Sequence, residues 1–325
     1  MPAPSTKPTA SRRKRVLTWH VHGNYLYYLT QAPHDFYLPV KPGKPEGYGG
    51  RAGTLPWGDN VYEIDAEEVR NCPFDVILYQ SHRNYLQDRL EILSDDQLRL
   101  PQVYLEHDPP REHPTDTEHP VDDPNMLLVH VTHFNRLMWD SNRTPTTVIE
   151  HGVVVPPDVQ YTGEMERGIS VVNNIARRGR RTGADVFTYA RQHVPLDLAG
   201  MNAADLGGVG EVPYNQLLAF EAKYRFFFNP IRYTSLGLAV CEAMMIGMPI
   251  IGLATTEMSA VIQNDITGYV DTNVDHLIAY MIDLLRDPAK GRKLSAEARR
   301  YALEHFHIER FAQDWDRVIQ QMASI

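Results

Sequence analysis

Short apolar runs alternate with longer amphipathic segments along most of the sequence. Runs of about four to eight apolar residues are typical of strands buried on both faces of a parallel sheet, whereas apolar positions three and four residues apart indicate helices. The pattern predicts an α/β protein rather than a helical bundle or a β-sandwich. Strands are expected at residues 16–21, 74–79, 103–106, 147–150, 169–172, 196–199 and 226–229, and helices at residues 214–223, 276–285, 295–306 and 309–322.

Residues 226–272 show this alternation most clearly, as a strand, a turn, a helix and a second strand. Thr234 and Ser235 carry side chains that cap helices well, so a helix is expected to begin at about Leu236. Gly247 is expected to end it, because glycine adopts the left-handed backbone of a helix C-terminus at little cost. In a parallel sheet such a turn lies at the carboxyl ends of the strands, where ligands commonly bind.

The beginning of this helix has the features of an anion site, and its middle holds one carboxylate. The first backbone N–H groups, at Leu236, Gly237 and Leu238, have no partners within the helix and can bind a phosphate, which Gly237 allows to come close. Glu242 is the only charged residue in the helix and is costly to bury without a partner. It could accept the hydroxyls of a ribose. The alternative, a salt bridge or an exposed charge at a domain edge, stays open.

The segment LGLAVCEAMMIGMPIIGLATTEMSAVIQNDITGYV resembles the donor-site segment of retaining GT-B glycosyltransferases, the glycosyl transferases of group 1 or family 4. The resemblance implies an α/β protein with the GT-B fold, in which two Rossmann-like domains face a cleft. It also implies a nucleotide-sugar as co-substrate, retention of configuration, and no metal or other cofactor. The matching residues are Gly237, Leu238, Glu242, Ala243, Met244, Gly247, Pro249, Thr267 and Gly268.

The chain departs from the family pattern at two positions. The family's first glutamate falls on Thr234, and a later one falls on Ala260. Because the first acid lies near the transferred sugar in the family, Thr234 takes a catalytic position, and its lack of a carboxylate alters the donor sugar or weakens catalysis. The ribose-binding glutamate is retained as Glu242. The retained and replaced residues therefore predict nucleotide binding more strongly than they predict sugar transfer.

The N-terminal part opens like a Rossmann-like domain. The strand at 16–21 runs into His22, Gly23 and Asn24, and the resemblance places Gly23 and Asn24 at the donor phosphates, although the family's double glycine is absent. His20 and His22 are either polar groups of the cleft or hydrogen-bonded parts of the structure.

His107 follows the strand at 103–106, and the resemblance gives it a catalytic contact with the sugar near the leaving phosphate.

The Gly- and Pro-rich residues 41–59 form a loop that could bind the acceptor. Residues 209–212 correspond to the family's nucleobase pocket.

A basic loop follows the strand at 169–172. Four of its residues, numbered 177, 178, 180 and 181, are arginines, and arginine is suited to bidentate contacts with phosphate oxygens. Asn174 takes the place of the family's usual arginine. We expect Arg177 and Arg181 to converge on the phosphates around Gly179. An exposed basic loop without a ligand is the alternative.

These considerations give a complete set of expected site residues. The catalytic positions are His107 and Thr234, and no metal ligands are assigned. The donor-binding residues are Gly23, Asn24, Arg177, Arg181, Ser235, Leu236, Gly237, Leu238 and Glu242.

Length and composition fit a protein of two domains. The 325 residues predict a disordered tail at residues 1–14 and two domains, at 15–155 and 156–308. The resemblance implies that the N-terminal domain binds the acceptor and the C-terminal domain binds the donor. By resemblance, a last helix at 309–325 crosses back to the first domain.

Charge, cysteine content and histidine spacing narrow the class further. The net charge of −9 argues against general nucleic-acid binding, although residues 12–15 are basic. The two cysteines, Cys72 and Cys241, fit a reducing, cytoplasmic compartment. No apolar run reaches the roughly 18 residues of a membrane span. Peripheral contact with the inner face of a membrane stays an alternative. The histidines at 107–133 lack the usual zinc spacings.

The sequence therefore predicts a hexosyltransferase-like glycosyltransferase with a nucleotide-sugar donor and a sugar-containing or lipid-linked acceptor. One alternative is a GT-B-like nucleotide- or glycan-binding protein that is catalytically weak or inactive, because Thr234 and Ala260 replace acids. A more distant one is a nucleic-acid-directed protein acting through residues 11–15. The base, the sugar and the acceptor are left open.

Overall fold

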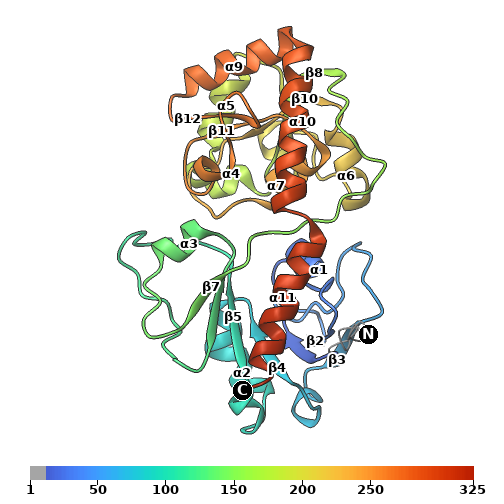
Figure 1. Ribbon diagram of the computed structural model, residues 1–325, viewed down its shortest axis with the longest axis vertical. Helices are drawn as coiled ribbons and strands as arrows, with labels where there is room; N and C mark the ends of the chain where they lie inside the picture. The colour runs from blue at the N-terminus through green and yellow to red at the C-terminus, as the bar shows by residue number, and fades with distance from the viewer. Residues whose placement is uncertain (1–11) are drawn as a thin grey trace, which may run out of the picture.

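The computed structural model describes residues 12–325, so all of the predicted tail except residues 12–14 lies outside the described residues. Two parallel β-sheets lie one above the other, each flanked by helices (Figure 1). We call the seven-stranded sheet with its helices the N-terminal lobe, and the five-stranded sheet with its helices the C-terminal lobe. The structure thus has the predicted α/β architecture.

The sheet of the N-terminal lobe has the order β3-β2-β1-β4-β5-β6-β7, and all of its strand pairs are parallel. The order reverses direction at β1, which is the switch point where doubly wound sheets bind ligands. Its strands are β1 (Arg15–Thr18), β2 (Asp35–Val40), β3 (Val61–Asp65), β4 (Val76–Tyr79), β5 (Gln102–Glu106), β6 (Leu127–His130) and β7 (Thr146–Val148).

The sheet of the C-terminal lobe has the order β12-β11-β10-β8-β9 and is also parallel. Its direction reverses between β8 and β10. All six residues of β10 are buried, as expected for a central strand covered by helices on both faces. The strands are β8 (Met165–Val171), β9 (Leu196–Ala199), β10 (Tyr224–Asn229), β11 (Ile250–Leu253) and β12 (Gly268–Asp271).

Helices cover the sheets and show the capping that their sequences favour. Asn273 caps α9, and Asp287 caps α10 by accepting from the N–H groups of Ala289 and Lys290, with Pro288 in the first turn. The helices are α1 (Gly23–Leu29), α2 (Arg89–Ile92), α3 (His133–Met138), α4 (Ile175–Arg178), α5 (Ala184–Arg191), α6 (Tyr214–Glu221), α7 (Leu238–Ile246), α8 (Met258–Val261), α9 (Val274–Arg286), α10 (Pro288–His305) and α11 (Ile308–Met322).

Helix α11 returns to the N-terminal lobe and packs beside α1 (Figure 1). Phe311 is fully buried, and its ring lies 5.6 Å from that of Tyr25 on α1. Asp316 of the same helix pairs with His34 at 3.1 Å. The chain therefore crosses between the lobes twice, once before β8 and once between α10 and α11.

The two crossings are bonded to each other. The N–H of Val153 donates to the carbonyl of Phe306 at 3.1 Å, and Val153 forms a β-bridge with His307. The guanidinium of Arg310 donates to the carbonyls of Glu150 and His151. The hinge between the lobes is therefore one hydrogen-bonded unit.

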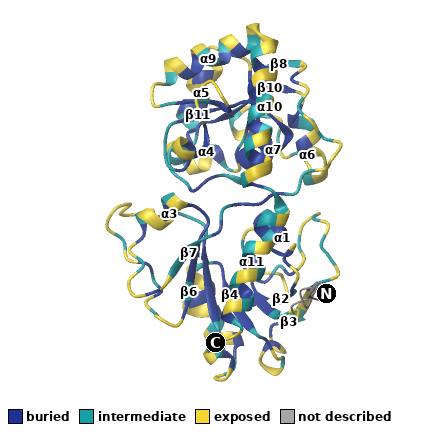
Figure 2. Cartoon of the chain, viewed as in Figure 1, coloured by how far each residue is buried: buried dark blue, intermediate teal, exposed yellow. Residues whose placement is uncertain are grey.

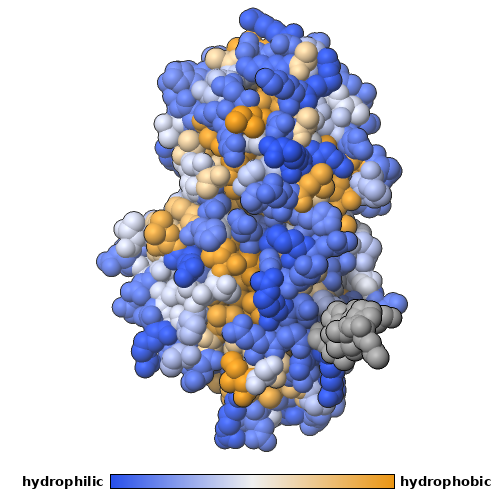
Figure 3. Space-filling model, in the orientation of Figure 1, coloured by the Kyte–Doolittle hydropathy of each residue, from blue (hydrophilic) through white to orange (hydrophobic). Residues whose placement is uncertain are grey.

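Burial follows the two sheets. The strands are mainly buried, and the outer faces of α9 and α10 are exposed (Figure 2). Most of the face drawn in Figure 3 is hydrophilic, and its hydrophobic residues gather in patches. Among residues 12–325, no helix combines the length and the apolar character needed to span a bilayer.

Most predicted elements are present, with shifted ends, but β2 and β3 were not anticipated. In β3 the exposed Tyr62, Glu63 and Asp65 give no buried-strand pattern. β3 lies at the edge of its sheet, where such a pattern is weak.

Gly152 gives a test of the hinge. A Cβ at this position would overlap the Cβ of Phe311, so Gly152→Ala cannot be accommodated without moving α11 or the crossing segment. We expect it to lower the free energy of unfolding by about 1–3 kcal/mol. Urea denaturation measures this, and an unchanged midpoint would contradict the described contact.

Candidate functional site

A cavity of about 540 Å³ lies between the lobes, at the carboxyl ends of β8 and β10. Both lobes contribute to its wall, which is the arrangement expected where two switch points face each other. The N-terminal lobe contributes His22, Gly23, Asn24 and Tyr25. The C-terminal lobe contributes Asn173, Arg178, Gly200, Met201, Glu211, Val212, Tyr214, Thr234, Gly237, Leu238, Ala239 and Glu242, among others.

The predicted capping of α7 is wrong. The helix begins at Leu238 with Gly237 as its N-cap, and no side chain caps it. Thr234 and Ser235 lie in the turn before the helix, because that turn is held elsewhere: the Leu236 carbonyl accepts a hydrogen bond from His151 Nε2 at 2.7 Å. Thr234 lines the cavity, whereas Ser235 and Leu236 are buried beside it.

The N-terminus of α7 is open to the cavity. Within residues 12–325, the N–H groups of Leu238 and Ala239 have no acceptor, as expected for the first turn of a helix. Gly237 needs no left-handed backbone, and a Cβ there would meet no heavy atom within 4 Å. These groups can therefore bind an anion that approaches through the cavity.

The structure changes the predicted choice of arginines. Arg177 is exposed and binds Asp205 at 3.2 Å and Asn202 at 3.0 Å, away from the cavity. Gly179, with φ of +61°, separates α4 from a 3₁₀ turn, so residues four apart no longer share a face. Arg178 lines the cavity in place of Arg177.

Arg178 and Arg181 are cations without carboxylate partners among the described residues. Burial lowers the pKa of both groups, and Arg178 lowers the pKa of Arg181 further by repulsion. Two guanidinium groups that repel each other and have no carboxylate partner favour an anion between them. Arg178 lines the cavity and Arg181 does not, so Arg178 and the N-terminus of α7 make this part of the cavity a candidate anion site.

Glu242 of α7 lines another part of the cavity and is only 3% exposed. Its Oε1 accepts a hydrogen bond from the hydroxyl of Tyr28 at 2.5 Å, and Tyr28 lies 3.0 Å from the hydroxyl of Tyr214. Burial raises the pKa of Glu242, and the Tyr28 hydrogen bond opposes this rise. The carboxylate therefore has a partner, but from the opposite lobe.

A second buried acid lies near Glu242. Glu221 of α6 is 1% exposed, and neither of its carboxyl oxygens has a hydrogen-bond partner within residues 12–325. Burial raises its pKa well above the ordinary value, and the charge of Glu242 adds to the shift. Burial and the charge of Glu242 therefore both favour the protonated form of Glu221.

His107 lies behind the cavity wall, with its ring 4.3 Å from that of His22 and 4.7 Å from that of Tyr25. The Gln80 amide donates to the carbonyl of Trp19, so its oxygen faces His107 Nε2 at 3.2 Å. The His107 Nε2 therefore carries the proton, and Nδ1 is left as an acceptor. Burial lowers the pKa of His107 well below its usual range, so the ring is neutral.

His20 and His22 were expected to be either polar groups of the cleft or hydrogen-bonded parts of the structure, and they differ in this respect. His20 donates from Nδ1 to the carbonyl of Gly50 at 2.6 Å and so holds the loop that follows β2. His22 lines the cavity with Gly23 and Asn24. His20 is structural, and His22 is a wall residue.

One group of possible metal ligands occurs among residues 12–325: His82, Glu106 and His119, whose ligand atoms lie within 4.8 Å of one another. The backbone N–H of Val121 donates to His119 Nδ1 at 3.1 Å, so the neutral ring carries its proton on Nε2. That proton points at Glu106 Oε2, 3.2 Å away. The group is a hydrogen-bonded pair beside His82, and its geometry does not offer the Nε2 lone pair that a metal would need.

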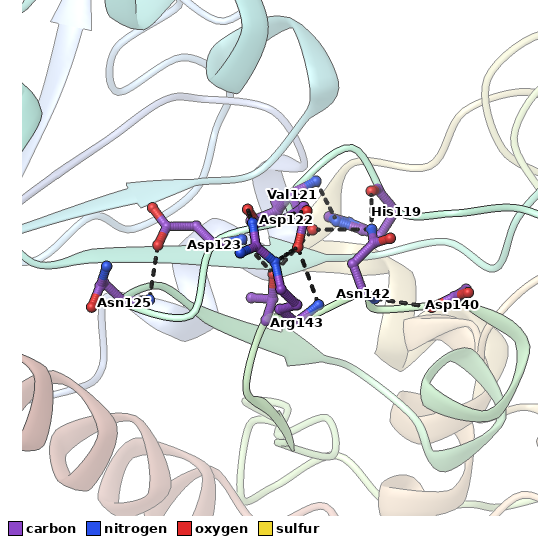
Figure 4. A network of polar contacts seen from close by, with 9 residues as sticks. His119, Val121, Asp122, Asp123, Asn125, Asp140, Asn142 and Arg143 are labelled. Atoms are coloured by element: carbon purple, nitrogen blue, oxygen red, sulfur yellow. Dashed lines mark hydrogen bonds and ion pairs between the residues drawn. The ribbon is translucent and has the colours of Figure 1, made fainter.

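Neighbouring turns hold His119 in place (Figure 4). Asn142 donates its side-chain amide to the His119 carbonyl at 2.9 Å, and Arg143 binds the Asp122 carboxylate through two nitrogens. The segment between β5 and β6 is therefore fastened to the turn that precedes β7.

Several site residues escaped the sequence analysis. Tyr25 and Tyr28 lie three residues apart, in an aromatic run that begins after Gly23 and Asn24, but such a run more often belongs to a core than to a site. Arg178 has a suitable side chain, but Arg177 was preferred because it was expected to converge with Arg181 around Gly179. Tyr214 gave no signal, since only the fold brings it to the cavity, and Glu211 was expected only through the resemblance of residues 209–212 to the nucleobase pocket.

Comparisons with known proteins agree with this architecture. Residues 202–301 match the family model Glycosyl transferases group 1. Sucrose-phosphate synthase from Thermosynechococcus elongatus superposes with a TM-score of 0.69 at 14% identity, over 96% of this chain and 100% of that one. HepE from Anabaena, solved with UDP and glucose, gives 0.69 at 12% identity, over 96% and 100%. No curated protein sequence matches the chain.

AviGT4, a glycosyltransferase involved in avilamycin A biosynthesis, is also similar, with a TM-score of 0.61 at 14% identity over 96% of this chain and 98% of that one. The fold is thus the GT-B fold, two Rossmann-like units that face a cleft. The family match covers the segment that carries Glu242, so this part of the chain is similar to the glycosyl transferases of group 1.

Glu106 gives a prediction about stability and pH. Burial raises its pKa to about 7, with the N–H of Asp108 opposing the shift. The native state therefore keeps a proton that the unfolded chain loses near pH 4.5, and stability falls as pH rises from about 4.5 to about 7.

Glu106→Gln removes this cost. Relative to the wild type, its free energy of unfolding should rise by about 3 kcal/mol between pH 4.5 and pH 8, measured by urea denaturation at both values. A difference that does not change with pH would contradict the buried pair.

Proposed function

We propose that the cavity between the lobes binds a nucleotide-sugar and that the protein transfers its sugar to an acceptor with retention of configuration and without a metal. The observation that supports this proposal is the division of the cavity wall: the guanidinium of Arg178 and the free N–H groups of α7 lie at one part, and the Glu242 carboxylate lies at another. A nucleoside diphosphate presents the complementary groups, a charged diphosphate and a ribose with two hydroxyls.

Arg178, Arg181 and the N-terminus of α7 would bind the diphosphate. Cleavage of the sugar–phosphate bond leaves negative charge on the departing nucleoside diphosphate, and fixed donors stabilise that charge more in the transition state than in the ground state. Two guanidinium groups and a helix N-terminus supply positive charge without a metal, which supports the metal-independent reaction proposed here.

Glu242 would accept hydrogen bonds from the ribose, and Glu211 and Val212 lie where the resemblance places the nucleobase pocket. HepE was solved with UDP, which makes uridine nucleotides the first donors to test. Gly23 and Asn24 face the same cavity from the N-terminal lobe and would contact the donor from that side.

The reaction proposed is a same-face displacement. The anomeric carbon loses its bond to the diphosphate oxygen as the acceptor oxygen bonds to it, and the acceptor proton passes to an oxygen of the departing phosphate. The described acids of the cavity wall are Glu211 and Glu242, and the second is already bonded to Tyr28. This supports a route without a carboxylate nucleophile.

His22, His107 and Thr234 would surround the transferred sugar. His22 and Thr234 line the cavity, and His107 packs against the ring of His22 with Nδ1 available as an acceptor. Thr234 stands where the family has an acid, so a hydroxyl rather than a carboxylate would contact the sugar. This is the observation that favours the second candidate, a nucleotide- or glycan-binding protein without transfer.

We assign the donor to residues 156–308 and a sugar-containing or lipid-linked acceptor to residues 15–155. The free thiols of Cys72 and Cys241 support a cytoplasmic location, because that compartment keeps thiols reduced. A lipid-linked acceptor would require peripheral contact with a membrane.

A thermal-shift screen against UDP-, GDP- and ADP-sugars tests donor binding. We expect one base to raise the melting temperature of the wild type, Glu242→Ala to abolish the rise, and the exposed control Glu304→Ala to keep it. If no nucleotide shifts the wild type, the proposal fails. Binding without sugar release in EDTA or with added Mg²⁺ would favour the second candidate.

Gly237→Ala tests the anion site. Its Cβ would project into open space in front of α7, so the variant should fold with stability within about 1 kcal/mol of the wild type. The nucleoside diphosphate selected by the screen should bind about tenfold more weakly, because the methyl group holds the phosphate away from the N–H groups. Calorimetry measures the affinity, and an unchanged value would place the phosphates elsewhere.

A further inference from the structure

A chain of three hydrogen-bonding groups joins the two lobes at the cavity. Tyr28 belongs to α1 of the N-terminal lobe, whereas Tyr214 begins α6 and Glu242 lies on α7 of the C-terminal lobe. The Tyr28 hydroxyl lies 3.0 Å from that of Tyr214 and 2.5 Å from Glu242 Oε1. Tyr28 is fully buried and does not itself line the cavity, while the other two residues do.

The direction of the chain is fixed by its last member. Glu242 in its ionised form only accepts hydrogen bonds, so the Tyr28 O–H donates to it, and the Tyr28 oxygen in turn accepts from Tyr214. Burial and the neighbouring carboxylate raise the pKa of Tyr28 well above its usual value, so the phenol keeps its proton. Donors arranged in series polarise one another and strengthen the final bond to Oε1.

The other carboxylate oxygen, Oε2, is in a different position. Within residues 12–325 it has no protein donor, yet it is not among the enclosed polar atoms that lack a partner. Because Glu242 lines the cavity, Oε2 is the oxygen that the cavity reaches. One oxygen of the carboxylate is thus bound by the protein, and the other is free to bind a ligand.

We propose that Tyr28 is a positioning residue for Glu242: it binds Oε1 from the opposite lobe, so that Oε2 alone accepts a single ribose hydroxyl of the bound nucleotide. The inference rests on the proposed function and refines it, since a carboxylate with two free oxygens would bind both ribose hydroxyls. It also makes recognition of the ribose depend on the N-terminal lobe, which otherwise contacts the other end of the donor.

Calorimetry with UDP, 2′-deoxy-UDP and 3′-deoxy-UDP tests this, in the wild type and in Tyr28→Phe. In the wild type, loss of one hydroxyl should weaken binding about tenfold or more, and loss of the other by about threefold or less. In Tyr28→Phe, Glu242 is no longer held in one orientation. The larger of the two losses of affinity, called penalties below, should then fall to about threefold or less. A role of Tyr28 in stability alone would leave the ratio of the two penalties unchanged.

The matched control is Tyr27→Phe, which removes a hydroxyl from the neighbouring residue of α1, where the phenol makes no hydrogen bond to residues 12–325. It should keep the wild-type penalties. Tyr214→Phe removes the first donor of the chain but leaves the Tyr28–Glu242 bond, and should give an intermediate penalty. This variant also carries the test if Tyr28→Phe does not fold.

Equal penalties for the two deoxynucleotides in the wild type would show that Glu242 binds both hydroxyls and would overturn the proposal. Wild-type penalties in Tyr28→Phe would overturn it as well. Failure of the proposed function looks different: the wild type would bind no nucleoside diphosphate, or Glu242→Ala would bind UDP as tightly as the wild type.

Discussion

The double crossing between the lobes is the constraint on which the rest of the structure depends. The crossing before β8 and the crossing between α10 and α11 are bonded to each other through Val153 and Phe306, and Arg310 adds hydrogen bonds from the second to the first. Two connecting segments that were not bonded to each other would allow the lobes to twist independently. Joined as one unit, they restrict the lobes to a hinge motion, which keeps the carboxyl edges of the two sheets opposite each other.

Across the cleft, hydrogen bonds from side chains hold the lobes in the arrangement described. The Glu242 carboxylate accepts from Tyr28, and the Glu257 carboxylate accepts from the backbone N–H of Phe134 at the beginning of α3. The Tyr233 hydroxyl donates to the carbonyl of Pro110. Two of these contacts satisfy charged acceptors that would be costly to leave buried and unpaired, so closure is coupled to electrostatics as well as to packing.

Sequence analysis predicted the α/β fold and singled out residues 226–272 because these signals are local. The alternation around residues 226–272 and the single acid of an apolar helix can be read from one segment, and both are present in the structure. The capping of α7 could not be read in this way, because a contact from His151, far away in the sequence, sets the preceding turn. The choice between Arg177 and Arg178 depended on the backbone of Gly179, and the partner of Glu242 comes from the other lobe.

Helix α11 has a consequence for the order in which the molecule forms. It packs on α1 of the N-terminal lobe, yet it is synthesised after every strand of the C-terminal lobe. During synthesis, the apolar surface around Tyr25 in the N-terminal lobe therefore stays uncovered until the sheet of the C-terminal lobe has been made. The C-terminal lobe can fold as a unit, whereas the N-terminal lobe reaches its final packing only when residues 308–322 have emerged.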